Sequence, residues 1–262
     1  MKCLTVKVRQ MKFLKELIFP VIIGYSLAAC NPAYYLPTKQ NVQVFDKKGD
    51  IVAGGNLGLY GTIGAEAGYA FTDHIGIYSS LKGFNISTYG GSEEKVIRDY
   101  IWDNEFILYS KLKYDFYAAC NFGVGFGEFD INNPYYELKL NRQFVQPSIG
   151  VTFFDVIQTS LSTRFTRLDY TLNSLAINAT PYDNQMMRDY FMFGDLDHRD
   201  ICFLEPAITL GLDFGGVKTQ FQYSRALNIG GGSVRNWDQN LFLSFTFNIS
   251  AFFPSPKHGI NR

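Results

Sequence analysis

The sequence predicts an all-β fold, a transmembrane antiparallel β-barrel of about ten strands, from three observations. Apolar and polar residues alternate with period two from about residue 50 onwards, and no later window shows a convincing helical stripe. The polar faces consist of Gly, Ser, Thr, Gln and Asn with an occasional charge, which suits a crowded, wet interior better than the charged exterior of a soluble sandwich. Short and long connections also alternate, as they do in bacterial membrane barrels.

The expected strands fill residues 50–251, which we take as the barrel domain. Tight turns such as 72–74 join strands at one end, and long polar connections join them at the other. Because such barrels turn tightly on the periplasmic side, both chain termini are expected there, with 252–262 as a periplasmic tail. The ten expected strands are 50–60, 61–72, 74–87, 98–111, 115–129, 141–153, 156–171, 201–214, 217–228 and 239–250.

The clearest hairpin is centred on Gly215–Gly216, a two-residue turn that supplies positive φ at no steric cost. Counting outward from this turn, Leu210 opposes Phe221 on an apolar face, and Asp213 opposes Lys218 on a polar face. A shift of one residue would scramble both faces, so the pattern predicts the register as well as the strands.

Composition limits the classes of function. Aromatic residues make up 16% of the 262 residues and Gly numbers 24, a composition that favours strands and membrane interfaces. Lys plus Arg and Asp plus Glu both number 24, so no general attraction for nucleic acid is expected.

The N-terminal residues predict a targeting signal. Basic residues up to Lys15 precede a short apolar run that ends in Leu27-Ala28-Ala29-Cys30. This run is broken by Pro20 and Gly24 and is too short for a transmembrane helix, which needs about 20 apolar residues. The pattern resembles a bacterial lipoprotein signal. The resemblance implies a cleaved signal peptide, 1–29, and a lipidated segment, 30–49, with palmitate-type acyl chains attached at Cys30.

Four stretches carry a wider resemblance, to a family of Bacteroidetes outer-membrane β-barrel lipoproteins of uncharacterised function. They are Asn41–Asp50, Ala67–Gly76, Phe144–Gly150 and Leu204–Ile208. The resemblance implies the barrel fold and an outer-membrane location, but no activity. Residues 31–35 lack the acidic run that resembles a surface-export signal in these bacteria, so the N-terminal lipid anchor is expected on the periplasmic side.

Charged and amide side chains at the alternate strand positions that form the polar faces are expected to form a lumen network. A ten-stranded barrel is narrow, so these groups should pair and close the lumen rather than line a pore. The alternative is a small polar cavity, for which Gly123, Gly125 and Gly127 leave room unless a large side chain such as Tyr78 or Phe144 fills it. The expected network comprises Glu66, Lys82, Glu105, Arg164, Glu205, Asp213 and Lys218, with Gln220 and Gln222 beside them.

Catalytic and metal-binding patterns are weak. Asp197 and His198 in the longest connection could activate water at a barrel rim, but a second acidic pair is not evident, and a solvated loop is the favoured interpretation. Cys120 and Cys202 have no metal-type spacing, and small wall residues are favoured over a disulfide. No catalytic residue, cofactor or metal is therefore assigned.

The sequence thus favours a non-enzymatic barrel lipoprotein with a structural or interaction role. Its expected partners are outer-membrane lipid and a larger outer-membrane protein complex, which it would join as an accessory subunit. A barrel that binds or transports small solutes is the alternative, and a rim hydrolase is a third, weaker hypothesis.

Overall fold

The computed structural model describes Tyr35 and residues 37–42, 45–87, 96–130, 136–174, 200–230 and 239–252. Cys30 and the expected signal peptide lie outside the described residues, as do the Asp197–His198 pair and residues 253–262 of the expected tail. Among the described residues, no helix is long and apolar enough to cross a membrane.

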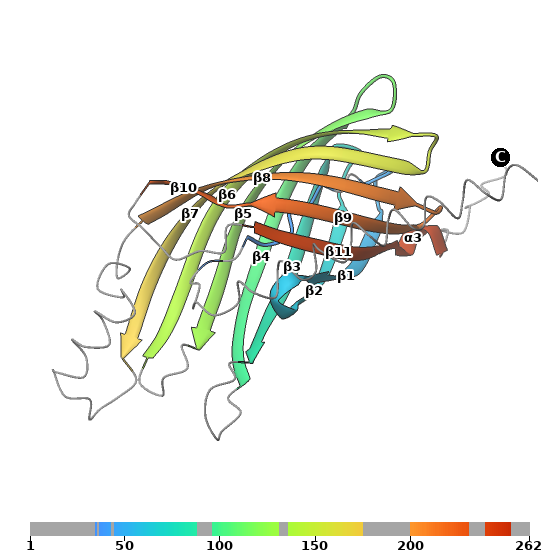
Figure 1. Ribbon diagram of the computed structural model, residues 1–262. Helices are drawn as coiled ribbons and strands as arrows, with labels where there is room; N and C mark the ends of the chain where they lie inside the picture. Colours follow the sequence, from blue (N-terminus) through green and yellow to red (C-terminus); the bar gives the residue numbers. More distant parts are fainter. Residues whose placement is uncertain are drawn as a thin grey trace, which may run out of the picture. The chain divides into compact units, whose positions relative to one another are not determined.

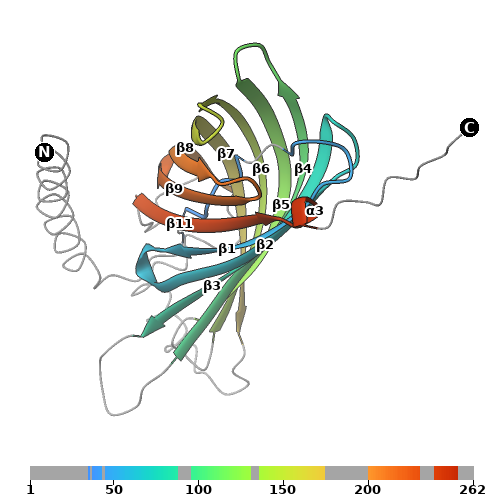
Figure 2. The same cartoon turned by 90° about the vertical axis from the view of Figure 1, so that its right-hand side faces the viewer.

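The described strands form one antiparallel sheet that closes on itself (Figure 1 and Figure 2). Each strand pairs with its neighbour in sequence from β1 to β8, β8 pairs with β9, β9 with β11, and β11 with β1. The short β10 continues the wall begun by β9 and also pairs with β8, so the barrel has ten wall positions. The strands are β1 Ile51–Gly58, β2 Thr62–Ala70, β3 Ile75–Ser87, β4 Val96–Lys111, β5 Phe116–Asp130, β6 Tyr136–Phe153, β7 Ile157–Ser174, β8 Asp200–Asp213, β9 Val217–Arg225, β10 Leu227–Gly230 and β11 Gln239–Asn248.

The predicted strands and register are confirmed. In the β8–β9 hairpin Leu210 pairs with Phe221 and Asp213 with Lys218, as expected from the turn at Gly215–Gly216. The main differences are that β6 begins earlier and β7 ends later than the alternation suggested, and that the expected strand 217–228 is interrupted at Ala226. The β8–β10 pairing beyond this point contains a register shift between Asn228 and Gly230.

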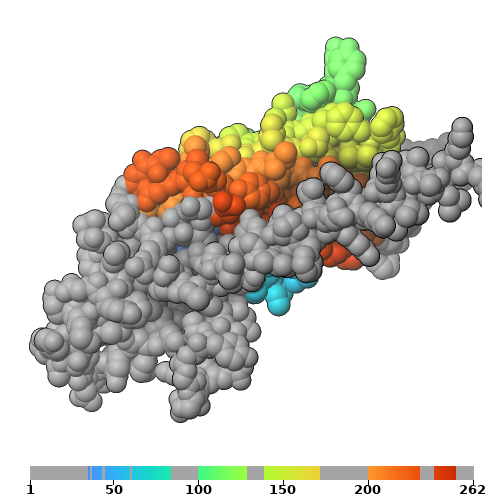
Figure 3. All heavy atoms as spheres, viewed as in Figure 1, coloured from blue at the N-terminus to red at the C-terminus, as the bar shows by residue number. Residues whose placement is uncertain are grey.

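The two ends of the barrel differ in their connections. We call the end that carries 71–74, 112–115, 154–156 and 214–216 the turn end (Figure 1, right), and the opposite end the loop end. In Figure 3 the β4–β5 turn projects beyond the body of the barrel. Within the described residues, a single 3-10 turn, Leu59–Gly61, joins two strands tightly at the loop end. The C-terminal helix α3, Ile249–Phe252, lies at the turn end directly after β11.

Side chains alternate between two environments along most of the described wall, for example on β2, β8, β9 and β11. Leu210, Phe221 and Phe245 point outward and are 55%, 48% and 40% exposed, whereas Gln220 and Thr246 point inward and are buried. The outer face is thus apolar, and the interior combines many buried polar side chains with a smaller apolar cluster around Phe45, Tyr78 and Tyr109. An apolar outer face and polar lumen groups are what a membrane-spanning barrel needs and the reverse of a soluble sandwich.

The outward apolar surface stops before the loop end. On β6, Ile149 is apolar and exposed, but Gln143 and the outward residues beyond it are polar. On β7, Phe165 is followed by Arg167, which forms an exposed ion pair with Asp200 of β8 at 2.7 Å. Because charged side chains avoid hydrocarbon, this pair indicates where the barrel leaves the apolar layer on the loop side.

Candidate functional site

The lumen is occupied by the chain's own N-terminal residues. We call Tyr35 together with residues 37–42 the lumen segment. All of these residues are buried, and side chains from β2, β3, β5, β6, β7, β8, β9 and β11 contact them. Residues 37–42 form no strand or helix, and Tyr35 forms a single β-bridge.

The segment begins beside β8. The Tyr35 hydroxyl donates to the Glu205 carboxylate, which also accepts a bond from Thr166 at 2.5 Å. The Tyr35 ring stacks on Phe203, with centroids 4.6 Å apart. Two residues further along the chain, the carbonyl oxygen of Pro37 accepts a bond of 2.8 Å from the Asn240 side chain of β11.

Two arginines hold Thr38. The Thr38 hydroxyl accepts a bond of 2.8 Å from Arg142 and another of 2.8 Å from Arg164. Arg142 is also paired with the buried Asp103 carboxylate, which accepts a further bond of 3.0 Å from Lys82. A guanidinium presents several donors in a fixed plane, so each arginine can bind a wall residue and the lumen segment together.

An aromatic ring lies close to both arginines. Phe144 lies with its centroid 5.1 Å from the Arg142 guanidinium carbon and 4.6 Å from that of Arg164, within the range of cation–π attraction. The ring sits over Gly123, where any Cβ would collide with it. The space left by Gly123 is therefore filled by Phe144, one of the two outcomes expected from the sequence, and is not a cavity.

Lys39 provides the central ion pair. Its ammonium lies 2.5 Å from the Glu66 carboxylate, which also accepts bonds from Asn56 at 3.3 Å and Thr246 at 3.2 Å. The Lys39 carbonyl in turn accepts bonds from Lys82 and Arg164. Glu66 thus depends on a cation that the lumen segment supplies.

The next two residues bind the walls through their backbone. Gln222 donates to the Gln40 carbonyl at 2.8 Å and accepts from the Gln40 amide at 2.6 Å, a reciprocal pair like that between two strands. The Asn41 carbonyl accepts bonds from Asn121 at 3.0 Å and Gln146 at 2.5 Å. Backbone groups buried in a polar lumen are satisfied in this way without a regular partner strand.

The chain reaches the turn end at Phe45. This ring packs against Tyr109, with centroids 5.7 Å apart, over Gly68 and Gly76 near the turn-end limits of β2 and β3. Asp50 then closes a small loop by accepting bonds of 3.0 Å from the amides of Asp46 and Lys47, and β1 follows.

Opposite charges balance at the middle of the lumen. Four cations (Lys39, Lys82, Arg142 and Arg164) and four carboxylates (Glu66, Asp103, Glu105 and Glu205) are buried there. Removing Lys39 would leave three cations to four carboxylates. Because an unpaired buried charge is costly, the lumen segment is an electrostatic component of the barrel and not simply a filler.

The structure brings the residues predicted for the lumen together, with one peripheral exception. Glu66, Lys82, Glu105, Arg164, Glu205, Gln220 and Gln222 are buried on the inward face. Asp213 and Lys218 pair at 3.3 Å near the turn end, apart from the central cluster, beside a polar pocket of about 380 Å³. The sequence analysis did not include Asp103 and Arg142, although both occupy alternate strand positions that point inward, as Glu105 does two residues after Asp103.

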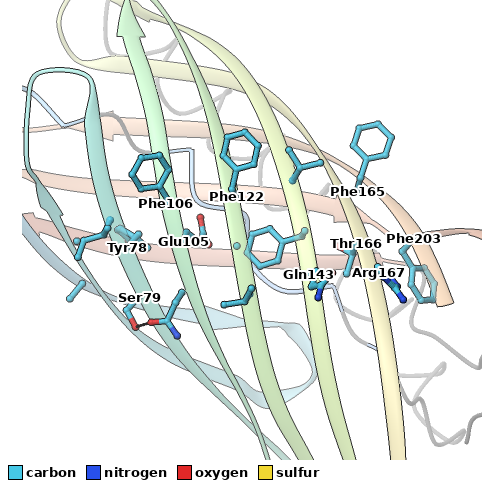
Figure 4. Close-up of a pocket in the computed structure, with 18 of the residues that line it drawn as sticks. Tyr78, Ser79, Glu105, Phe106, Phe122, Gln143, Phe165, Thr166, Arg167 and Phe203 are labelled. Carbon is cyan, nitrogen blue, oxygen red and sulfur yellow. Dashed lines mark hydrogen bonds between the residues drawn. The ribbon is translucent and has the colours of Figure 1, made fainter. Parts of the chain in front are cut away.

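A mainly apolar groove of about 1260 Å³ lies on the outer surface of the described residues. It crosses the wall from β1 to β8, and Figure 4 shows Phe106, Phe122 and Phe165 along it. Its open side faces outward, because Tyr78 and Phe144 on the inner side of the wall are buried.

The described cysteines and His74 lie outside the lumen network. Cys120 and Cys202 are free thiols that point outward from β5 and β8, which agrees with the expected small wall residues. No cluster of three or more His, Cys, Asp or Glu side chains within the described ranges could hold a metal ion. His74 lies at the turn end, where its Nδ1 is 3.3 Å from the Tyr109 carbonyl.

Comparison with known proteins gives only distant likenesses. No family model and no curated protein matches the chain. The β domain of the Bordetella autotransporter BrkA is similar at 10% identity and a TM-score of 0.43, over 78% of this chain and 100% of that one. The KdgM porin is similar at 8% identity (TM-score 0.35, 76% and 98%), and Ail, the attachment invasion locus protein of Yersinia pestis, at 10% (TM-score 0.24, 78% and 98%). None of these likenesses bears on what this chain binds or does.

The fold is that of an outer-membrane β-barrel. The closed antiparallel wall, its apolar outer face and the tight turns gathered at one end together decide this. In barrels of this kind the end with the tight turns usually faces the periplasm.

Proposed function

We propose that this protein is a non-enzymatic outer-membrane barrel lipoprotein with a closed lumen, which acts as a structural or interaction module. One observation carries the proposal: the lumen segment crosses the barrel and is bound there by wall side chains at every residue from Pro37 to Asn41. A solute would have to displace these bonds and separate buried ion pairs to pass.

The lipoprotein part of the proposal rests on Cys30 and the residues around it. Replacement Cys30→Ala should abolish incorporation of labelled palmitate, because the thiol is the predicted acylation site. Labelling that persists in the variant would contradict this part. The relation to the Bacteroidetes barrel lipoproteins is likewise a proposal, supported by the stretches that resemble them.

Ion conductance tests the closed lumen. The purified full-length protein in planar bilayers should give no sustained channel openings, whereas Lys39→Met combined with Thr38→Val, which removes the central bonds of the segment, should raise the frequency of openings at least tenfold. Sustained conductance by the unchanged protein would overturn the proposal in favour of a transport barrel.

The interaction role predicts that the protein forms a stable complex with another protein in the membrane. After mild detergent extraction the tagged protein should migrate on native gels as an assembly larger than a solitary barrel in its detergent micelle. The outward polar cluster in which Trp102 donates to Ser79 at 2.8 Å and Ser79 donates to Asn104 at 3.0 Å supports such contacts, because polar groups facing hydrocarbon favour a protein neighbour. A strictly solitary barrel would argue against the role.

A further inference from the structure

We propose that Lys39 and Asn56 form an intramolecular isopeptide bond, with Glu66 as the group that transfers the protons. The bond joins the Nζ atom of Lys39 to the side-chain carbonyl carbon of Asn56 and releases ammonia. It ties the lumen segment covalently to β1. The inference goes beyond the proposed function and does not depend on it, because other residues of the segment are bound to the walls by hydrogen bonds alone.

The two reacting groups contact the same carboxylate. The Lys39 Nζ atom lies 2.5 Å from Glu66 Oε1, and the Asn56 amide nitrogen Nδ2 donates a bond of 3.3 Å to Glu66 Oε2. Glu66 therefore bonds to the attacking nitrogen through one oxygen and to the departing nitrogen through the other. Groups held together in this way react as if within one molecule, which removes most of the entropic part of the barrier.

Two neighbouring strands and a glycine hold the amide beside Glu66. Asn56 of β1 lies opposite Gly64 of β2, and Glu66 follows two residues later on the same inward face. A Cβ atom at Gly64 would lie 2.7 Å from Asn56 Oδ1 and 2.8 Å from Nδ2, so the glycine leaves the room that the amide occupies. Asn56 Oδ1 is buried without a hydrogen-bond partner among the described residues. The amide is thus held through the nitrogen that leaves in the reaction.

The three side chains are closed off from solvent. Lys39, Asn56 and Glu66 are 3%, 2% and 6% exposed. Because charges are poorly solvated in such surroundings, transfer of one proton from the Lys39 ammonium to Glu66 costs less there than it does in water. The resulting amine is the nucleophile, and the exclusion of water protects the reaction from hydrolysis.

The reaction balances without a further reactant. Glu66 takes one proton from the Lys39 ammonium, and the free amine attacks the Asn56 carbonyl carbon. A carbon–nitrogen bond forms to Nζ while the bond to Nδ2 breaks. The second proton lost by Nζ passes through the carboxyl group to Nδ2, which leaves as ammonia. Glu66 ends as a neutral acid, so one cation and one carboxylate lose their charges together and the charges of the lumen stay balanced.

Lys82 provides a contrast within the same lumen. Its ammonium lies 3.0 Å from the Asp103 carboxylate, but Asp103 also accepts a bond of 2.7 Å from Arg142. A guanidinium offers no carbonyl carbon for an amine to attack. We therefore expect Lys82 to keep a free amine, which makes it an internal control for the reaction of Lys39.

Peptide mass spectrometry tests the bond. The full-length protein is extracted from the membrane, its folded fraction is selected by heat-modifiable migration, and it is digested with trypsin, which cleaves after Lys47 and Lys48. The peptide Gly49–Lys82 should be joined to the peptide that carries Lys39, with the mass of one ammonia missing, and should exceed its free form at least tenfold. Free Gly49–Lys82 as the main product would overturn the proposal. Loss of water instead of ammonia would mean that a carboxyl group reacted, which would overturn the assignment to Asn56.

Matched variants separate the chemistry from the packing. Asn56→Ala removes the carbonyl carbon but keeps the ion pair of Lys39, and Gly64→Ala displaces the amide, so both should reduce the linked peptide at least tenfold in folded protein. Folded Glu66→Gln should also stay unlinked. Thr246→Val removes another hydrogen bond of Glu66, of 3.2 Å, and should leave the linkage complete. Linkage that persists in Asn56→Ala would overturn the bond, and linkage in folded Glu66→Gln would overturn the role of the carboxylate.

Discussion

The outer and inner faces of the barrel are built from alternate residues of the same strands, yet they are stabilised in different ways. Outward residues such as Leu210 and Phe221 pair across strands, and any apolar surroundings stabilise them. Inward residues such as Arg142 and Glu66 depend on particular partners, some of which belong to the lumen segment. Substitutions on the outer face should therefore report depth in the membrane, and those on the inner face should report loss of a specific partner.

The largest effect is expected for Arg142→Met. This change leaves Asp103, a fully buried carboxylate, with Lys82 as its remaining cation and deprives Thr38 of a donor. The free energy of unfolding should fall by about 3–5 kcal/mol. Denaturant titration of the protein refolded in lipid vesicles measures it. The double variant with Asp103→Asn should recover part of the loss, and a loss as large in the double variant would show that the ion pair is not the cause.

The face assignment itself predicts the second effect. Phe221→Arg places a charge on the outward face and should cost about 2–4 kcal/mol near the midplane, as should Leu210→Arg and Phe245→Arg. Gln220→Arg, the neighbouring residue on the inward face, should disturb assembly less, because Asp213 lies nearby. Heat-modifiable migration on gels compares them. A folded Phe221→Arg beside a collapsed Gln220→Arg would reverse the two faces.

A smaller loss of stability is expected when one wall partner of the lumen segment is removed. Gln222→Met keeps the size of the side chain but leaves the Gln40 amide and carbonyl without their wall partner. Unpaired buried polar groups of this kind cost about 1–3 kcal/mol. Denaturant titration should show this loss, accompanied by faster proteolysis of the N-terminal residues. An unchanged midpoint would mean that the segment does not depend on its backbone bonds.

The smallest effect is expected at the loop-side rim. Arg167→Ala breaks a bidentate pair with Asp200, with bonds of 3.0 and 2.7 Å, but both side chains are more than half exposed. Exposed pairs contribute little, and salt screens them. A loss as large as that of Gln222→Met in the same titration would place this pair inside the apolar layer and move the membrane boundary assigned here.

The same contrast explains what the sequence could and could not predict. The strands, their register and the outward residues follow from period-two alternation, which is a local property, so Leu210 and Phe221 were placed correctly. The tight turns at Tyr114–Asp115 and Phe154–Asp155 were predicted from strand spacing, although their positive φ values occur without glycine. Each of these predictions needs only residues that are close in sequence.

The occupant of the lumen could not be predicted in this way. Residues 37–42 carry no periodic pattern, and their partners lie far away in the chain, such as Gln222, which is 182 positions from Gln40. The alternation of polar and apolar residues identified Glu66 as a lumen residue, but no pattern in the nearby sequence indicated that Lys39 would pair with it. The filled lumen is a long-range electrostatic match between a wall and a segment, and only the three-dimensional structure reveals it.

The position of the lumen segment constrains the order in which the molecule can assemble. The segment precedes β1, and β1 pairs with β11, the last strand of the described residues, to complete the wall. Drawing the segment afterwards through a closed tube would require buried ion pairs such as Lys39–Glu66 to form in a lumen already packed with side chains. We therefore expect the wall to close around the segment, which then acts as an internal template for the barrel that encloses it.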